Sequence, residues 1–103
     1  MSMPLKSSYI GRYVIVRTNS AGVHFGLLEE KQGDEVRLSD ARRIWKWTSA
    51  HPEAGACSGL AQYGAGPESK IAFTGELEIT GAIEVIPCTS VSIETIKAGK
   101  WAS

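Results

Sequence analysis

The segment Ala41–Trp47, with the sequence ARRIWKW, concentrates the side chains of this chain that are best suited to bind a planar anion. It holds two of the three tryptophans and three of the eleven basic residues. An indole stacks on a flat ring, and a guanidinium donates paired hydrogen bonds to a phosphate. Stacking on an aromatic side chain contributes about 1–3 kcal/mol per base, which is enough to help hold a small nucleotide.

A strand conformation would sort this segment into two faces, because side chains alternate along a strand. One face would carry Arg43, Trp45 and Trp47, and the other would carry Arg42, Ile44 and Lys46. In one interpretation Ile44 and one tryptophan fill the core while the arginines are solvated. In the other, an indole and a guanidinium form the rim of a binding site. A single turn of helix is the alternative conformation for the segment.

A second candidate lies at the turn that follows Arg17, where hydroxyl side chains and glycine come together. Exposed backbone amides in such a turn can cradle an anion, although the same residue types are typical of an ordinary hairpin loop. Together the two segments give the predicted ligand-binding residues, which are Arg17, Thr18, Ser20, Gly22, Arg42, Arg43, Trp45 and Trp47.

Motifs of enzymes and metal sites are incomplete in this sequence. Gly64 and Gly66 are followed by Pro67, so neither a dinucleotide-binding fingerprint nor a phosphate-binding loop of nucleotide hydrolases is formed. The H-x-E of zinc deaminases occurs at residues 51–53, but Val91 stands where the second cysteine of the P-C-x-x-C half would be needed. With two histidines and no ligand pair at zinc spacing, we expect no catalysis, no metal and no cofactor.

The elements that must position these residues are short strands. Strand signals, rich in β-branched and aromatic residues, occur at Tyr13–Thr18, Val23–Glu30, Glu35–Leu38, Lys70–Thr80 and Ala82–Ile86. The first three predict an antiparallel meander. Ser39 and Asp40 are expected to break the chain before Ala41–Trp47, and the last two strands are expected to pair across Gly81. Thr89 is expected to cap a short C-terminal helix.

These elements predict one mainly β domain over residues 1–103 with minor α structure: a small, strongly bent antiparallel sheet or SH3-like barrel of five to six strands, followed by the helix. Residues 1–11 would form an N-terminal arm. Residues 48–69 would form a long central loop that holds at most a short helix.

The composition predicts a soluble protein of the cytoplasm. The basic and acidic residues balance at eleven each, which argues against general nucleic-acid binding. Residues 1–10 carry no apolar secretory core, and no apolar run approaches the ~20 residues of a membrane span. In a reducing compartment, Cys57 and Cys88 are expected to be free buried thiols.

Several strings identify a resemblance over roughly residues 12–101. YVIVRT followed by SAGV, ARRIW, AIEVIPCT and the final Trp101 resemble a family of small, functionally unnamed phage and prophage proteins. The segment of residues 50–67 departs from that pattern, because it is rich in glycine and lacks larger apolar residues.

The resemblance implies a phage-encoded factor that acts in the host cytoplasm. Joined to the Arg/Trp inventory, it leads to the hypothesis of a homo-oligomeric sponge, which sequesters a cyclic nucleotide or oligonucleotide immune signal without catalysis. The alternatives are a barrel module that inhibits a host protein, and a virion accessory protein. Nucleic-acid binding is a weaker alternative that would draw on the same Arg/Trp segment.

Overall fold

Seven elements make up the described part of the chain, which in this computed structural model comprises residues 9–19, 22–46, 57–66 and 69–98. In chain order they are β1 (Tyr13–Thr18), β2 (Val23–Gln32), β3 (Glu35–Lys46), α1 (Cys57–Tyr63), β4 (Lys70–Ile79), β5 (Ala82–Pro87) and α2 (Ser90–Ala98). The predicted mainly β fold with a C-terminal helix is confirmed, and α1 is the short helix expected within the central loop.

The strands form one antiparallel sheet in the order β4-β3-β2-β1-β5. The predicted meander of the first three strands is confirmed. The prediction that the last two strands pair with each other is wrong, because β5 pairs with β1. The two strands flanking Gly81 therefore lie at opposite edges of the sheet.

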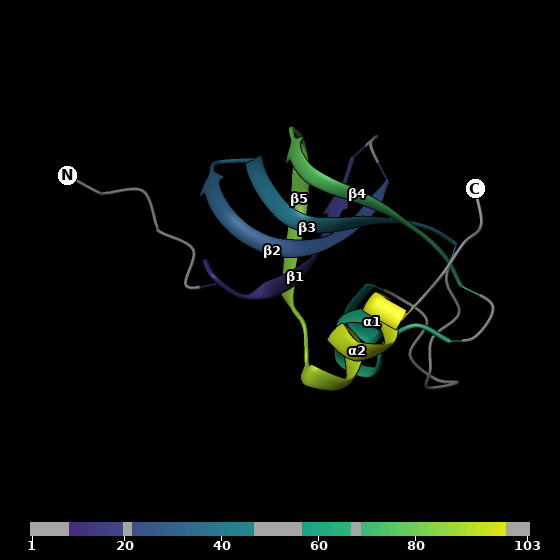
Figure 1. The fold of residues 1–103 in the computed structure, drawn as a ribbon. Helices are drawn as coiled ribbons and strands as arrows, with labels where there is room; N and C mark the ends of the chain where they lie inside the picture. The colour runs from purple at the N-terminus through teal and green to yellow at the C-terminus, as the bar shows by residue number, and fades with distance from the viewer. Residues whose placement is uncertain (1–8, 20–21, 47–56, 67–68, 99–103) are drawn as a thin grey trace.

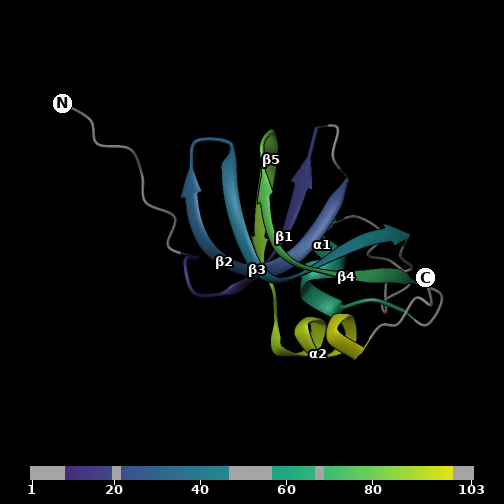
Figure 2. The ribbon, with the colours of Figure 1, turned by 45° about the horizontal axis from the view of Figure 1, so that its top comes forward.

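This connection requires the sheet to curl. In a flat sheet the two edges of five strands would be about 19 Å apart. The link from Ile79 to Ala82 spans three peptide units, or about 11 Å at most. Figures 1 and 2 show the resulting trough, with α1 and α2 together on its outer side. The predicted bent sheet is confirmed, and the five described strands do not close into a hydrogen-bonded barrel.

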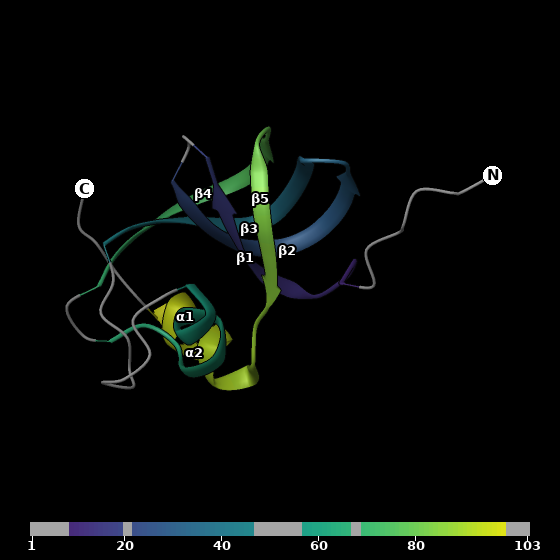
Figure 3. The ribbon, with the colours of Figure 1, turned by 180° about the vertical axis from the view of Figure 1, so that it is seen from behind.

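Backbone hydrogen bonds hold the link between β4 and β5 against the upper ends of the neighbouring strands. The Asn19 amide donates to the Gly81 carbonyl at 3.1 Å, and the Ala82 amide donates to the Asp34 carbonyl at 2.9 Å. The link is thereby tied both to the end of β1 and to the β2–β3 turn. From there β5 leads down to α2 (Figure 3).

Strand β3 differs from the prediction. The expected break at Ser39 and Asp40 is absent, and β3 continues from Glu35 to Lys46. Asp40 instead adopts a left-handed backbone with φ of 48° inside the strand. The segment that was predicted as a separate fourth strand is therefore the second half of β3. Trp47 lies outside the described residues.

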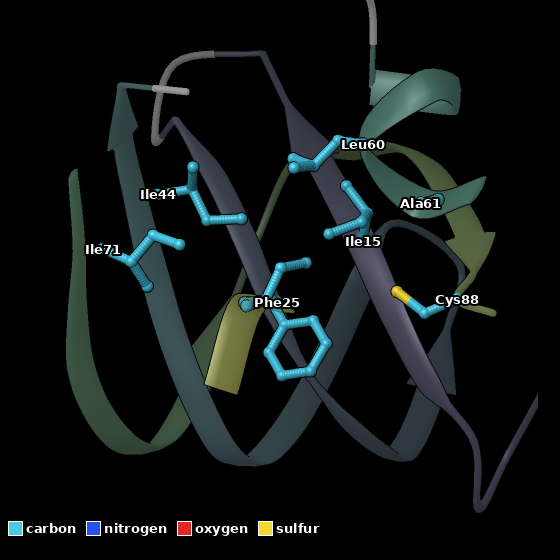
Figure 4. Packing of buried hydrophobic residues seen from close by; sticks show 8 residues of the cluster. Ile15, Phe25, Ile44, Leu60, Ala61, Ile71 and Cys88 are labelled. Carbon is cyan, nitrogen blue, oxygen red and sulfur yellow. The ribbon is translucent and has the colours of Figure 1, made fainter. Parts of the chain in front are cut away.

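The buried apolar side chains form two clusters, one on each face of the sheet. The outer cluster joins the sheet to the helices (Figure 4) and consists of Ile15, Phe25, Ile44, Leu60, Ala61, Ile71, Cys88 and Ile96. The inner cluster fills the trough and consists of Val14, Val16, Leu28, Val36, Leu38, Ala41 and Ile79. Because β1 contributes to both clusters, its central residues are fully buried.

Polar contacts fix the helix pair on the outer face. The buried Ser92 hydroxyl donates to the Leu60 carbonyl at 2.8 Å. The Thr89 hydroxyl accepts a hydrogen bond from the Ser92 amide at 3.2 Å, which confirms the predicted helix cap. Cys88 is a free, buried thiol, as expected, whereas the side chain of Cys57 lies outside the described residues. No helix in the described ranges is long and apolar enough to cross a membrane.

Candidate anion-binding site

The centre of the candidate site is a stacked pair on β3. The guanidinium carbon of Arg43 lies 3.8 Å from the centroid of the Trp45 ring. Trp45 is 52% exposed, so much of the indole is accessible to solvent beside the guanidinium. The pair therefore offers a charged hydrogen-bond donor and a stacking surface side by side, as the alternation within the segment predicted.

The turn between β1 and β2 contributes the surface against which Arg43 lies. Gly22 has φ of 86°, and a Cβ placed on it would come within 3.3 Å of the Nη2 of Arg43. The Thr18 hydroxyl and amide both donate to the Gly22 carbonyl, at 2.7 and 3.1 Å. Glycine at this position lets the guanidinium approach the backbone, and Thr18 holds the residue in place.

Of the predicted arginines, Arg43 alone lacks a carboxylate partner among the residues that the structure describes. Arg17 pairs with Glu84 at 3.2 Å, and Arg42 pairs with Asp40 at 3.0 Å. An uncompensated guanidinium next to an indole is suited to bind an anion that carries a flat ring. This charge asymmetry could not be predicted, because it depends on which acidic residues the fold brings to each arginine.

The structure separates Arg42 from this pair. Its side chain is 15% exposed, and its guanidinium carbon lies 5.9 Å and 5.2 Å from the ring centroids of Phe25 and Phe73. The same group donates to the backbone carbonyl of Asp40 at 2.7 Å. Arg42 is thus committed to contacts within the fold on the side of the sheet that faces the helices.

Arg17 is also on the other face of the sheet. It is in register with Val23, which in turn is in register with Ile44 of the outer cluster. Arg43 is instead in register with His24, in the neighbouring row. Thr18, Gly22, Arg43 and Trp45 are therefore the predicted site residues that the fold brings together. Ser20 and Trp47 lie outside the described residues.

Asp40 is a central residue of the region that the sequence did not identify as part of a site. Its carboxylate accepts hydrogen bonds from the Tyr13 hydroxyl at 2.6 Å and from Arg42, and it pairs with Lys97 at 3.3 Å. The Tyr13 hydrogen bond is the largest cause that holds the pKa of Asp40 below its ordinary value. The signal that could have identified Asp40 is the presence of an aspartate inside a strand-forming sequence, where aspartate is disfavoured.

A shallow depression of about 190 Å³ lies elsewhere, at the ends of β2, β3 and β4. Arg37 is one of its lining residues and pairs with Glu30 at 3.0 Å and with Glu78 at 3.3 Å. None of the predicted site residues lines it. Within the described ranges, no three side chains of the metal-binding types are grouped so that they could hold an ion.

Comparison with known proteins gives one match. A family model whose description is "Domain of unknown function (DUF6948)" matches residues 11–96. No match was found in a search of the curated proteins, and none was found in a search of the solved structures. The matched range contains all the described strands and most of α2.

Proposed function

We propose that this chain, which belongs to the DUF6948 family of domains of unknown function, binds a cyclic nucleotide or oligonucleotide without transforming it. In this proposal the protein is a sponge in the cytoplasm of a phage-infected host and withdraws an immune signal from its receptor. The observation that supports binding is the Arg43 guanidinium, which is stacked on Trp45 and has no described carboxylate partner.

The chemistry of the pair suits such a ligand. A base can stack on the exposed part of the Trp45 indole, and the guanidinium of Arg43 can donate to a phosphodiester oxygen. Gly22 adds no side chain that would compete for the guanidinium. Sequestration requires stacking and hydrogen-bond donors only. Trp45 supplies the stacking surface and Arg43 the donors, and Thr18 holds Gly22 beside the guanidinium.

The test is calorimetric titration of purified, nucleotide-free protein with a panel of cyclic mono-, di- and trinucleotides. Native mass spectrometry in parallel reports the mass of any retained ligand and the oligomeric state. We expect at least one member of the panel to bind. Arg43→Ala should weaken that binding by about tenfold to a hundredfold, which corresponds to one charge-assisted hydrogen bond.

Two variants control for general effects of charge. Arg37→Ala removes an exposed arginine at the far end of the sheet and should bind like the wild-type protein. Arg17→Ala removes a cation from the opposite face and should lower the affinity far less than Arg43→Ala. Absence of binding across the panel, or equal losses in all three variants, would contradict the proposal.

A second candidate function, inhibition of a host protein, is supported by Phe73. This residue is 67% exposed on the edge strand β4, which is a large exposure for a phenylalanine. An exposed aromatic side chain on an edge strand is typical of a protein-binding surface. Capture of a host protein that is lost in Phe73→Ser, together with no nucleotide binding, would favour this candidate.

A further inference from the structure

We infer that Asp40 is the positioning residue of this site, because its left-handed backbone decides which face of β3 carries Arg43 and Trp45. The inference rests on the proposed function for its binding measurement. Its structural measurement, the contact between Arg43 and Gly22, does not depend on any ligand.

The burial pattern of β3 reverses across Asp40. Before it, the even-numbered Val36 and Leu38 are buried in the inner cluster. After it, the even-numbered Ile44 is buried in the outer cluster, and the odd-numbered Ala41 faces inward. A regular strand keeps one parity on each face, so a residue has been inserted into the alternation at this point.

The neighbouring strands accommodate this irregularity with glycine. Gly75 of β4, with φ of 78°, is in register with Ala41. On β2, a Cβ on Gly26 would come within 3.0 Å of the Leu38 Cβ and 3.1 Å of the Ser39 carbonyl oxygen. Gly26, Asp40 and Gly75 thus form a crease across three strands, and the register of β3 with both neighbours shifts beside it.

The crease has a direct consequence for the candidate site. Without the inserted residue, Arg42 would point into the trough while Arg43 and Trp45 would point toward the helices. With it, Ile44 reaches the outer cluster, and Arg43 reaches Gly22. The same local feature therefore completes the core and presents the guanidinium.

The backbone and the carboxylate of Asp40 have separable roles. Aspartate tolerates a left-handed conformation better than most residues, and glycine adopts it without strain. The carboxylate ties the crease to β1 through Tyr13 and to α2 through Lys97. Replacement by glycine keeps the backbone role and removes the carboxylate, whereas a β-branched residue opposes the backbone role.

The experiment compares Asp40→Gly, Asp40→Asn, Asp40→Ala and Asp40→Val. In an ordinary strand position, valine would stabilise the fold more than glycine. At a left-handed position the order is inverted, so we expect the glycine and asparagine variants to unfold at higher denaturant concentrations than the alanine and valine variants. The alanine variant serves as the milder probe if the valine variant does not fold.

The site is monitored by nuclear Overhauser contacts between the Arg43 side chain and Gly22, and by calorimetric titration with the tightest cyclic nucleotide of the panel. Asp40→Gly and Asp40→Asn should keep these contacts and bind within about threefold of wild type. Asp40→Ala, and Asp40→Val where it folds, should weaken the contacts and bind on the order of tenfold less tightly, because neither alanine nor valine has the short polar side chain that helps aspartate and asparagine adopt a left-handed backbone.

The outcomes separate the two proposals. A valine variant that is more stable than the glycine variant, or that keeps the Arg43–Gly22 contacts and the affinity unchanged, would overturn the inference about Asp40. If the contacts and stabilities follow the expected order but no cyclic nucleotide binds the wild-type protein, the inference stands and the proposed function fails.

Discussion

Gly22 lies against the guanidinium of Arg43, so closely that a methyl group on its Cα would come within 3.3 Å of Nη2. Gly22 also has φ of 86°, in the left-handed region that favours glycine. The residue is therefore constrained by its backbone and by its neighbour at once, and the two constraints can be measured separately.

Gly22→Ala is expected to reduce the free energy of unfolding by about 1 kcal/mol through backbone strain and, in addition, to displace the Arg43 guanidinium. The displacement should weaken ligand binding. Gly33→Ala is the matched control, because Gly33 has φ of 59° and a methyl group on its Cα would meet nothing within 4 Å. Denaturant unfolding should show similar losses for both variants, and calorimetric titration should show weaker binding for Gly22→Ala alone.

The contacts of Asp40 with Tyr13, Arg42 and Lys97 predict a stability that declines at low pH. The Tyr13 hydrogen bond is the main cause that keeps the pKa of Asp40 below its ordinary 3.8, and Arg42 and Lys97 add to it against the opposing effect of burial. A carboxyl with a lowered pKa in the folded state stabilises the fold above its unfolded pKa. This contribution is lost as the pH falls from about 5 through the lowered value.

Lys97 predicts a stability that declines at high pH. Its pKa lies above the ordinary 10.5, chiefly through Tyr13 and then through Asp40, so its contribution is present at neutral pH and is lost as the pH rises through the raised value. We expect urea unfolding curves to show the largest stability between these limits. Asp40→Asn should lose less stability than wild type between pH 5 and pH 3, and an equal loss in both proteins would contradict the assignment.

Gly64 closes α1 against α2, and Gly64→Ala should be strongly destabilising. Gly64 has φ of 90°, and a Cβ on it would collide with the Thr95 hydroxyl and approach the Ser92 Cα at 3.2 Å. We expect a loss of roughly 2–4 kcal/mol in the free energy of unfolding, because strain and a backbone clash coincide. Gly81→Ala, with φ of 89° and nothing within 4 Å, should lose only about 1 kcal/mol. Equal unfolding midpoints for the two variants would show that α1 and α2 can move apart at little cost and would contradict the prediction.

Local sequence patterns predicted most of the strands and one part of the site. The β-branched residues of Tyr13–Thr18 are sufficient to identify β1, and alternation correctly placed Arg42 and Arg43 on opposite faces. The pairing of β5 could not be predicted locally. A glycine between two strands favours a hairpin in the sequence, and only the curl of the whole sheet brings β5 to β1.

The crease at Gly26, Asp40 and Gly75 is a second feature that local sequence patterns could not predict. Aspartate is typical of turns, so the sequence predicts that the strand ends at Asp40. Its place inside β3 depends on Gly26 and Gly75, which are distant in sequence. The ion-pair partners of the arginines also depend on residues that are distant in sequence. Arg17 and Arg42 resemble Arg43 as residues, and only the tertiary placement of Glu84 and Asp40 leaves Arg43 without a described carboxylate.

Cys88 provides a test of the outer cluster between the sheet and the helices. Burial is the main cause that raises the pKa of its thiol to about 11, while a hydrogen bond with Ser92 and the charge of Arg12 act in the opposite direction. The thiol is therefore protonated at neutral pH as well as inaccessible, and thiolate is the reactive form.

In a Cys57→Ser background, where Cys88 is the remaining thiol, we expect a disulfide reagent such as dithionitrobenzoate to react slowly at pH 7.5, at a rate set by opening of the fold. The same variant in concentrated urea should release one equivalent of reporter per chain at the rate of an exposed cysteine. Ile96→Ala, which removes a fully buried contact of the same cluster, should accelerate the reaction of the folded protein. Fast labelling of the folded Cys57→Ser variant would show that α1 and α2 do not seal this face of the sheet.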